Sequence, residues 1–203
     1  MLKLPVPVVL ASASPRRREL LSKLIEKFEV VVSDVDEEAL TVVNPVATSK
    51  KLARAKARAV AAIRPNALVI GADTVVYFGN EQFAKPTSTE DAVRMLERLS
   101  GRRHKVSTAV CVICGNAEMT GAFQTGVWFR DLTPEEISAY VATGEPMDKA
   151  GGYAIQGGAA GFVAKIEGSM DNVIGLPLDG LERLTRIVLS KLANGPLKEM
   201  LEG

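Results

Sequence analysis

The sequence VPVVLASASPRRR, which runs from Val6 to Arg18, predicts a buried β-strand that leads directly into a helix. The apolar run at residues 6–11 is typical of a short strand inside a sheet. Ser14 suits the N-cap of the following helix, and Pro15 suits its first position. Apolar side chains then recur at helical spacing, at Leu20, Leu21, Leu24, Ile25 and Phe28. We therefore expect a strand–helix unit here.

The start of this helix, residues 12–18, is a candidate anion site. A helix N-terminus leaves backbone N–H groups unpaired and carries about half a positive charge. Arg16 and Arg17 add planar guanidinium groups that match phosphate oxygens, and Ser12 adds a hydroxyl. Arginine at a helix start opposes the helix dipole, so three in a row favour a bound anion. The alternative is a capped surface helix whose arginines are solvated.

Composition places the chain among globular proteins, because its 203 residues are 47% hydrophobic and 24% charged. The net charge of +1 favours neither nucleic acid nor an anionic membrane as a partner, so an anion site must be built locally. We expect no transmembrane helix, since no run of about twenty apolar residues is present. The short apolar start does not make a convincing signal peptide. Cys111 and Cys114 are expected to be reduced core cysteines of a cytoplasmic protein.

Periodicity and turn residues predict the other elements of an α/β domain. We expect helices at residues 49–63, 88–99 and 177–191, and a further helix that opens with a capping box at residues 133–136. We expect strands at residues 29–35, 67–77, 105–113, 121–129 and 162–166. The strand at 67–77 is expected to be interrupted at residues 71–74, and the next two strands to pair across a Gly-Asn turn. Helices and strands alternate first and adjacent strands follow, which predicts a mixed sheet. No linker divides the chain, so we expect one domain over residues 1–203.

Asp73 is the second candidate for chemistry, because it lies inside the apolar segment VIGADTVV at residues 69–76. A charged carboxylate in such a strand costs free energy unless it is paired or binds a metal ion. Gly71 allows another group to approach the backbone closely. We favour a general base or a metal ligand, and the alternative is a structural hydrogen bond to a neighbouring turn.

Four other positions are weaker candidates when each is taken alone. Lys85 extends from a backbone that Pro86 makes rigid, although surface Lys-Pro pairs are common. Asp36 lies in an acidic turn and Lys56 on a basic, alanine-rich helix, and for both a solvated surface is the default interpretation. Gln156 follows several glycines and offers both a donor and an acceptor, as reading the edge of a base requires.

Together these segments resemble the Maf family of nucleoside triphosphate pyrophosphatases, also called septum-formation-protein-like. The resemblance spans about residues 8–178 and rests on the order of LASASPRR (10–17), SDVDE (33–37), LARAKA (52–57), GADTVV (71–76), KP (85–86), LSGRRH (99–104), EPMDKAGGY (145–153), IQ (155–156) and NVIGLPL (172–178). It implies a mixed, strongly twisted sheet flanked by helices, with two lobes around a central cleft, in a Maf/ITPase-like fold. The pairing of KAGGY with IQ resembles the branch that acts on dTTP and UTP.

The resemblance implies hydrolysis between the α and β phosphates of a nucleotide, which gives a monophosphate and pyrophosphate with the help of Mg or Mn. It implies that Asp73 accepts a proton from the attacking water, and that Asp36 and Asp73 hold the divalent cation. It also implies that the phosphates are held by Ser12, Arg16, Arg17, Lys56 and Lys85. Nucleotide choice would depend on Arg16, Thr74 and Gln156. This activity suits house-cleaning of the nucleotide pool and a role in cell-division arrest, and a homodimer is left open.

The same residues leave alternative functions to consider. A non-catalytic, nucleotide-sensing regulator of cell division would need only the binding groups. An enzyme that prefers modified pyrimidine nucleotides would have the same motifs. A nucleic-acid-binding module on the basic helix is disfavoured by the near-zero net charge and by the scarcity of aromatic residues there. A Ser-His-Asp triad lacks support, because the only histidine, His104, is remote in sequence from Ser12.

Overall fold

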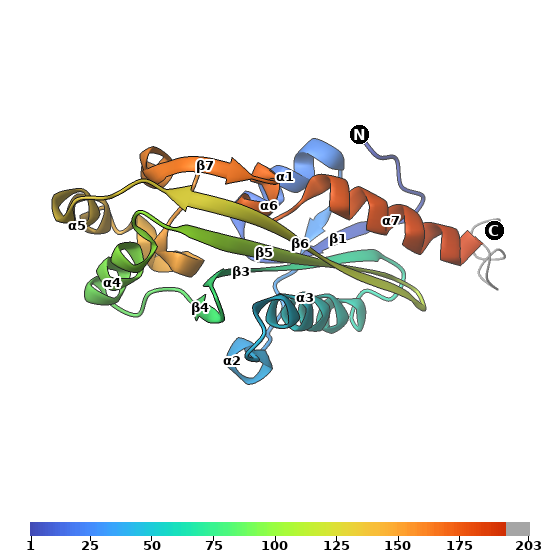
Figure 1. The fold of residues 1–203 in the computed structure, drawn as a ribbon. Helices are drawn as coiled ribbons and strands as arrows, with labels where there is room; N and C mark the ends of the chain where they lie inside the picture. Colours follow the sequence, from blue (N-terminus) through green and yellow to red (C-terminus); the bar gives the residue numbers. More distant parts are fainter. Residues whose placement is uncertain (194–203) are drawn as a thin grey trace.

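A seven-stranded mixed sheet forms the centre of the computed structural model, which describes residues 1–193 (Figure 1). The strand order is β2-β1-β3-β5-β6-β7, and β4 pairs with β3. The short strand β1 (Val8–Ala11) is parallel to β2 (Glu29–Val30) and to β3 (Leu68–Phe78). The antiparallel pairs involve β3, β4 (Glu81–Phe83), β5 (Arg103–Cys114), β6 (Ala117–Phe129) and β7 (Val163–Glu167). The predicted mixed sheet is confirmed, while residues 194–203 of the expected domain lie outside the described part.

Two strand predictions need correction. The expected interruption of β3 at residues 71–74 is wrong, because these residues pair with residues 108–111 of β5 in unbroken register. Gly71 and Asp73 therefore mark a contact on one face of β3 rather than a turn. The strand expected at residues 29–35 is only Glu29–Val30. The β5–β6 hairpin turns at Gly115 and Asn116 as predicted, and Gly115 has the positive φ of 54° that this turn requires.

The helix α1 (Pro15–Leu24) begins as its sequence predicts. The Ser14 side chain accepts a hydrogen bond from the Arg17 backbone N–H, and proline occupies the first turn. Leu20 and Leu21 are buried against the sheet. The strand–turn–helix unit at residues 8–24 is therefore present, with Arg16, Arg17 and Arg18 in the first turn of α1.

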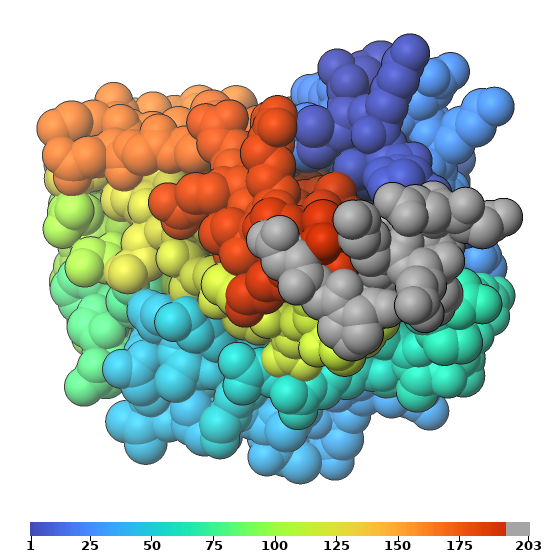
Figure 2. Space-filling model, turned by 90° about the vertical axis from the view of Figure 1, so that its right-hand side faces the viewer, coloured from blue at the N-terminus to red at the C-terminus, as the bar shows by residue number. Residues whose placement is uncertain are grey.

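The helices cover both faces of the sheet (Figure 1). On one face lies α3 (Pro45–Ala61), which begins before the predicted residue 49 because Asn44 caps it. On the other face lie α1, α6 (Met170–Ile174) and α7 (Leu178–Ala193), and in Figure 2 the N-terminal residues lie next to α7. At the far end lie α4 (Thr89–Leu99) and α5 (Pro134–Ala142), whose capping box is confirmed. The short elements α2 (Glu37–Leu40), α6 and β4 were not predicted. Residues 145–162, which include the glycine-rich stretch at 150–161, form three 3₁₀ turns, Glu145–Asp148, Ala150–Gly152 and Gly158–Phe162.

Three apolar clusters share the sheet and leave a polar band between them. One cluster packs β1, β3 and β5 against α1 and α7, and a second packs the opposite face of these strands against α3. A third packs the far ends of β3, β5 and β6 against α4 and α5. Ile70 belongs to the first cluster and Val76 to the third, so Asp73 and Thr74 lie where the clusters meet. The two ends of the sheet correspond to the two expected lobes.

Cys111 and Cys114 are both free and buried, as predicted. They lie in clusters on opposite faces of the sheet. Burial raises the pKa of the Cys111 thiol to about 11, so this thiol is protonated and unreactive near neutral pH. Among the helices of residues 1–193, none combines the length and apolar character that crossing a bilayer requires.

Candidate active site

Asp73 lies at the centre of a cluster of charged side chains. Its Oδ1 atom accepts a hydrogen bond of 2.7 Å from Nζ of Lys56, and the same Nζ lies 2.7 Å from Oε1 of Glu37. The side chains of Asp73 and Lys56 are only 8% and 12% exposed, whereas Glu37 is 53% exposed. A single ammonium group thus joins one buried and one accessible carboxylate. The site is therefore open to a ligand on the side of the accessible carboxylate.

The close approach of α3 to β3 places Lys56 beside Asp73. Gly71 makes this approach possible, because a Cβ atom there would lie 2.7 Å from the backbone nitrogen of Ala57 and would also meet the carbonyl oxygen of Ala53. Alanine at two of the buried positions of α3, Ala53 and Ala57, keeps the helix near the sheet at this point. The glycine that suggested a break in the strand is therefore a packing contact that positions the site.

The two carboxylates of the cluster differ in their electrostatic surroundings. Burial raises the pKa of Asp73, and the attraction of Lys56 and Arg17 only partly opposes this effect. Burial also acts to raise the pKa of Glu37, but its hydrogen bond to Lys56 and the charges of Lys85 and Arg17 outweigh it and lower the pKa. Two carboxylates with opposed pKa shifts suit a proton acceptor beside a permanently ionised group.

Glu37 is a cluster member that sequence reasoning missed, since Asp36 had been selected in its place. The Asp36 side chain caps α2 and accepts a 3.1 Å hydrogen bond from the backbone N–H of Ala39. Glu37, the first residue of α2, reaches Lys56 instead. The acidic run at residues 34–38 was the available signal, but choosing between neighbours needs the position of α2 against α3. The metal-binding role of Asp36 stays a prediction.

Arg17 forms the second part of the site, with its guanidinium held on three sides. Nε donates to the carbonyl oxygen of Gly175 at 2.9 Å, and one terminal nitrogen donates to Oγ1 of Thr74 at 3.0 Å. The other terminal nitrogen lies 3.4 Å from Oγ of Ser12, which also accepts from the Ser14 backbone N–H. Burial lowers the pKa of Arg17 and the nearby charge of Asp73 raises it, although the guanidinium keeps its charge at all accessible pH values.

The other predicted site residues lie around this centre. Arg16 is 3.8 Å from the carboxylate of Asp148, on the first 3₁₀ turn. Lys85 is exposed, and its charge is close enough to lower the pKa of Glu37. Gln156 is exposed in the glycine-rich region, and within residues 1–193 no hydrogen bond joins it to the cluster. The structure thus brings Ser12, Arg17, Lys56, Asp73 and Thr74 together, places Arg16 and Lys85 nearby, and leaves Gln156 apart.

His104 takes no part in this cluster. Its Nε2 atom is 2.8 Å from the hydroxyl of Tyr153 inside the apolar cluster at the far end of the sheet. Burial lowers the pKa of His104 to about 4, so the ring is neutral near pH 7. The hydroxyl of Ser12 contacts Arg17 instead, and the residues described therefore provide no Ser-His-Asp triad.

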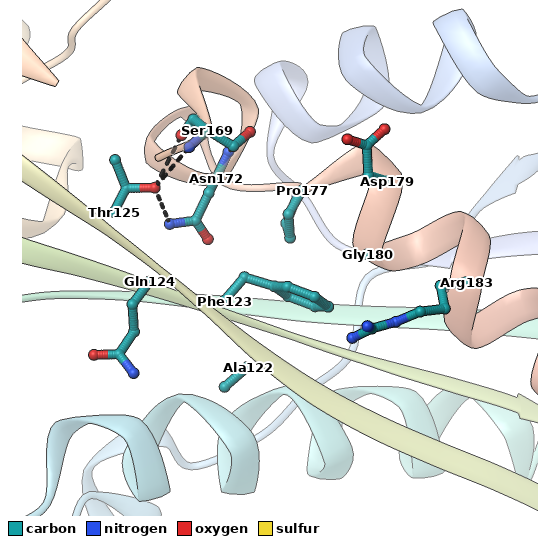
Figure 3. A pocket seen from close by; sticks show the side chains of 10 residues that line it. All are labelled: Ala122, Phe123, Gln124, Thr125, Ser169, Asn172, Pro177, Asp179, Gly180 and Arg183. Atoms are coloured by element: carbon teal, nitrogen blue, oxygen red, sulfur yellow. Dashed lines mark hydrogen bonds between the residues drawn. The ribbon is translucent and has the colours of Figure 1, made fainter. Parts of the chain in front are cut away.

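A cavity of about 550 Å³ lies away from Asp73, between β6 and the segments around α6 and α7 (Figure 3). Phe123 and Thr125 of β6 point toward it, and Asn172 and Arg183 enclose it from the helices. None of the expected site residues lines this space. The cavity is linked to the charged cluster through Asn172, whose backbone carbonyl oxygen accepts a hydrogen bond from the hydroxyl of Thr108.

The donor atoms of the cluster fit a hard divalent cation in part. Within residues 1–193, no three carboxylate, histidine or cysteine side chains converge as a closed metal centre. Asp73 and Glu37 still offer two carboxylates around one ammonium group, and carboxylate oxygen suits Mg²⁺ when water and phosphate oxygens complete the coordination. The arrangement therefore fits a cation that arrives with a phosphorylated substrate better than a structural metal ion.

Comparisons with known proteins show which family this chain belongs to. A family model described as "Maf-like protein" matches residues 7–188. A protein of Moorella thermoacetica named "dTTP/UTP pyrophosphatase" is 52% identical over 183 residues, covering 89% of this chain and 94% of its own. Proteins of the same name from Desulforamulus reducens and Thermococcus onnurineus are each 49% identical, and the matches cover 89% of this chain and 96% and 97% of theirs. Among solved structures, a HAM1 protein from Coxiella burnetii matches 90% of this chain and 99% of its own, at 13% identity and a TM-score of 0.46. The chain belongs to the Maf family.

Proposed function

We propose that this protein is a pyrophosphatase that hydrolyses dTTP and UTP to the nucleoside monophosphate and pyrophosphate. The observation that carries the proposal is the buried Asp73, which accepts a hydrogen bond from Lys56. The next residue in the sequence, Thr74, accepts a hydrogen bond from Arg17. The names of the relatives support the choice of substrate. House-cleaning of the nucleotide pool is the cellular role that this activity suits.

The basic groups of the site, together with a divalent cation, offset the charge of a triphosphate, because Lys56 and Arg16 already pair with carboxylates. A nucleoside triphosphate carries about four negative charges near neutral pH, because its terminal phosphate titrates like other phosphate monoesters. Arg16, Arg17, Lys56 and Lys85 provide four positive side chains, and Ser12 adds a hydroxyl beside the start of α1. Cleavage of a phosphoanhydride depends mainly on positioning and on neutralising charge, which this arrangement supplies.

Asp73 accepts the proton of the attacking water. Burial raises the pKa of this carboxyl, so it is a stronger base than an exposed aspartate, while the hydrogen bond from Lys56 fixes Oδ1. The other carboxylate oxygen is then the one left for the water and the cation. Lys56 also holds Glu37 in ionised form, which keeps a second anionic oxygen next to the base.

A divalent cation, Mg or Mn, would be held by Asp73 and Glu37, with Asp36 as the further carboxylate nearby in sequence. When bound, it supplies positive charge that stabilises the departing pyrophosphate. A cytoplasmic location and a homodimer are further parts of the proposal. Sedimentation velocity of the purified protein checks the homodimer.

Pyrophosphate release from a panel of canonical and modified nucleoside triphosphates tests the function. Wild-type protein with Mg or Mn should release pyrophosphate fastest from dTTP and UTP, and chelation of the metal should abolish the release. Binding of nucleotide without any pyrophosphate release would favour the non-catalytic regulator. Faster turnover of modified pyrimidine nucleotides would move the substrate assignment to those compounds while keeping the reaction.

A Glu37→Gln variant tests whether Glu37, rather than Asp36, completes the site. The amide keeps the size of the side chain but removes the charge beside Lys56, so the metal concentration needed for half-maximal rate should rise. Asp36→Asn is the matched control, because asparagine is also a good N-cap and preserves the start of α2. If Asp36→Asn alone raised the metal requirement, Asp36 would be the ligand.

A further inference from the structure

The short helix α6 holds the Arg17 guanidinium at two points. Directly, the carbonyl oxygen of Gly175, the residue that caps α6, accepts from Nε at 2.9 Å. Indirectly, a terminal nitrogen of Arg17 contacts Oγ1 of Thr74, which lies 2.9 Å from Oγ1 of Thr108. Thr108 then donates to the backbone carbonyl oxygen of Asn172 at 2.7 Å. Both paths begin at nitrogen atoms of the same guanidinium group and end at backbone carbonyl oxygens of α6 or its C-cap.

Counting protons fixes the direction of the second path. A threonine hydroxyl has a single proton to donate. The proton of Thr108 is given to the carbonyl oxygen of Asn172, so Thr74 must be the donor in the contact between the two hydroxyls. Thr74 therefore has no proton left for a ligand, and it serves Arg17 as an acceptor. An effect of Thr74 on nucleotide choice would then act through the position of Arg17.

Asn172 anchors α6 to the sheet. Its side chain is buried, and Nδ2 donates to the carbonyl oxygen of Val106 at 3.1 Å and to Oγ1 of Thr125 at 3.0 Å. Its Oδ1 accepts from the backbone N–H of Thr108 at 3.3 Å. The same Thr125 hydroxyl donates to the carbonyl oxygen of Ser169, the N-cap of α6 (Figure 3). These bonds fix α6 relative to β5 and β6, and therefore relative to Thr74 on β3.

We propose that Asn172 and Thr108 are positioning residues for Arg17, so that α6 acts as a clamp that aims the phosphate-binding guanidinium. A guanidinium has five N–H donors, and the contacts to Gly175, Thr74 and Ser12 use three of them. One N–H on each terminal nitrogen is left to donate to phosphate oxygens. The proposal rests on the proposed function for the identity of the substrate, but the clamp itself concerns any polyphosphate.

Thr108→Val is the sharpest test, because valine keeps the shape of threonine and removes the hydroxyl in the middle of the path. The Kd for inorganic triphosphate, measured by calorimetry, should rise about tenfold, the effect of weakening one hydrogen bond to a charged group. The KM for dTTP should rise by the same factor with kcat nearly unchanged, because a misplaced arginine weakens substrate and transition state alike. Thr108→Ser keeps the hydroxyl and should restore both constants.

Two controls separate positioning from a general loss of structure. Thr185→Val also removes a buried hydroxyl, one that has no hydrogen-bond partner among the described residues, and it should leave both constants unchanged. In an Arg17→Ala background, Thr108→Val should have no further effect, because the two changes act on one contact. An unchanged Kd in Thr108→Val, or full additivity with Arg17→Ala, would overturn the clamp. Absence of dTTP and UTP turnover in the wild-type protein would instead overturn the proposed function, while the Kd for triphosphate still decides the clamp.

Discussion

Replacing Asp73 with asparagine should lower turnover by at least about 100-fold without weakening the fold. The amide oxygen can still accept the hydrogen bond from Lys56, and Lys56 keeps its contact with Glu37, so the arrangement of the side chains is retained. What is lost is the ability to take a proton, together with the charge of one of the two carboxylates proposed to hold the cation. A general base contributes roughly 100- to 10,000-fold to a rate, or about 2.7–5.4 kcal/mol of barrier at 1.36 kcal/mol per tenfold change.

The same substitution should leave the protein equally stable or more stable. Burial raises the pKa of Asp73, so the folded state binds this proton more tightly than the unfolded state does. Stability therefore falls as pH rises through the window between the ordinary value of 3.8 and the higher native pKa, and the ionised carboxylate is a cost at pH 7. Asparagine removes that cost, which is the pattern expected where a site is tuned for activity rather than stability.

Pyrophosphate release and thermal unfolding, measured on the same preparations at pH 7, test both parts of this reasoning. We expect kcat to fall by at least about 100-fold, the Kd for triphosphate to stay within about threefold, and Tm to stay level or rise. A fall in Tm of several degrees, at about 2–4 °C per kcal/mol for a chain of this size, would show that Asp73 mainly pairs Lys56 for stability. Normal turnover would refute its role as the proton acceptor.

Three other outcomes follow from the geometry. Gly71→Ala should destabilise the protein by about 1–3 kcal/mol or more, because the new methyl group would lie 2.7 Å from the backbone nitrogen of Ala57, and chemical denaturation measures this loss. Arg16→Ala should raise the KM for dTTP about 10- to 100-fold through lost phosphate contacts, whereas Arg18→Ala, at an exposed position of the same turn, should not change it. Burial lowers the pKa of His104 from 6.5 to about 4, so the unfolded state binds this proton more tightly and the free energy of unfolding should fall by roughly 3 kcal/mol as pH drops through that range. In denaturation series at several pH values, His104→Gln should remove this contribution to the pH dependence of the free energy of unfolding.

Local chemistry explains which parts of the fold the sequence predicts well. The start of α1 depends on Ser14 and Pro15, which act within one turn, and the β5–β6 hairpin depends on two residues at its turn. The capping box of α5 is equally local. In the same way, the arginines of α1 and the buried carboxylate of β3 were recognisable because each residue is unusual for its own element. Predictions of this kind need no knowledge of the tertiary structure.

Features that depend on distant contacts could not be predicted in this way. The sequence around Gly71 looks like a strand break, because nothing nearby shows that α3 packs on it. Glu37 was overlooked because its partner, Lys56, lies on another helix, and α2 is only four residues long. The role of Asn172 depends on hydrogen bonds to β5 and β6, although its motif carries part of the family resemblance.

The continuity of β3 sets a limit on how this site can vary in evolution. Successive residues of a strand point to opposite faces, so Asp73 reaches Lys56 on one side of the sheet while Thr74 reaches Arg17 on the other. Inserting or deleting one residue in β3 before this pair would exchange the two side chains and would also shift the register with β5. We therefore expect related sequences to differ in length at the turns around residues 79–80 and 115–116, and to keep the length of β3 unchanged.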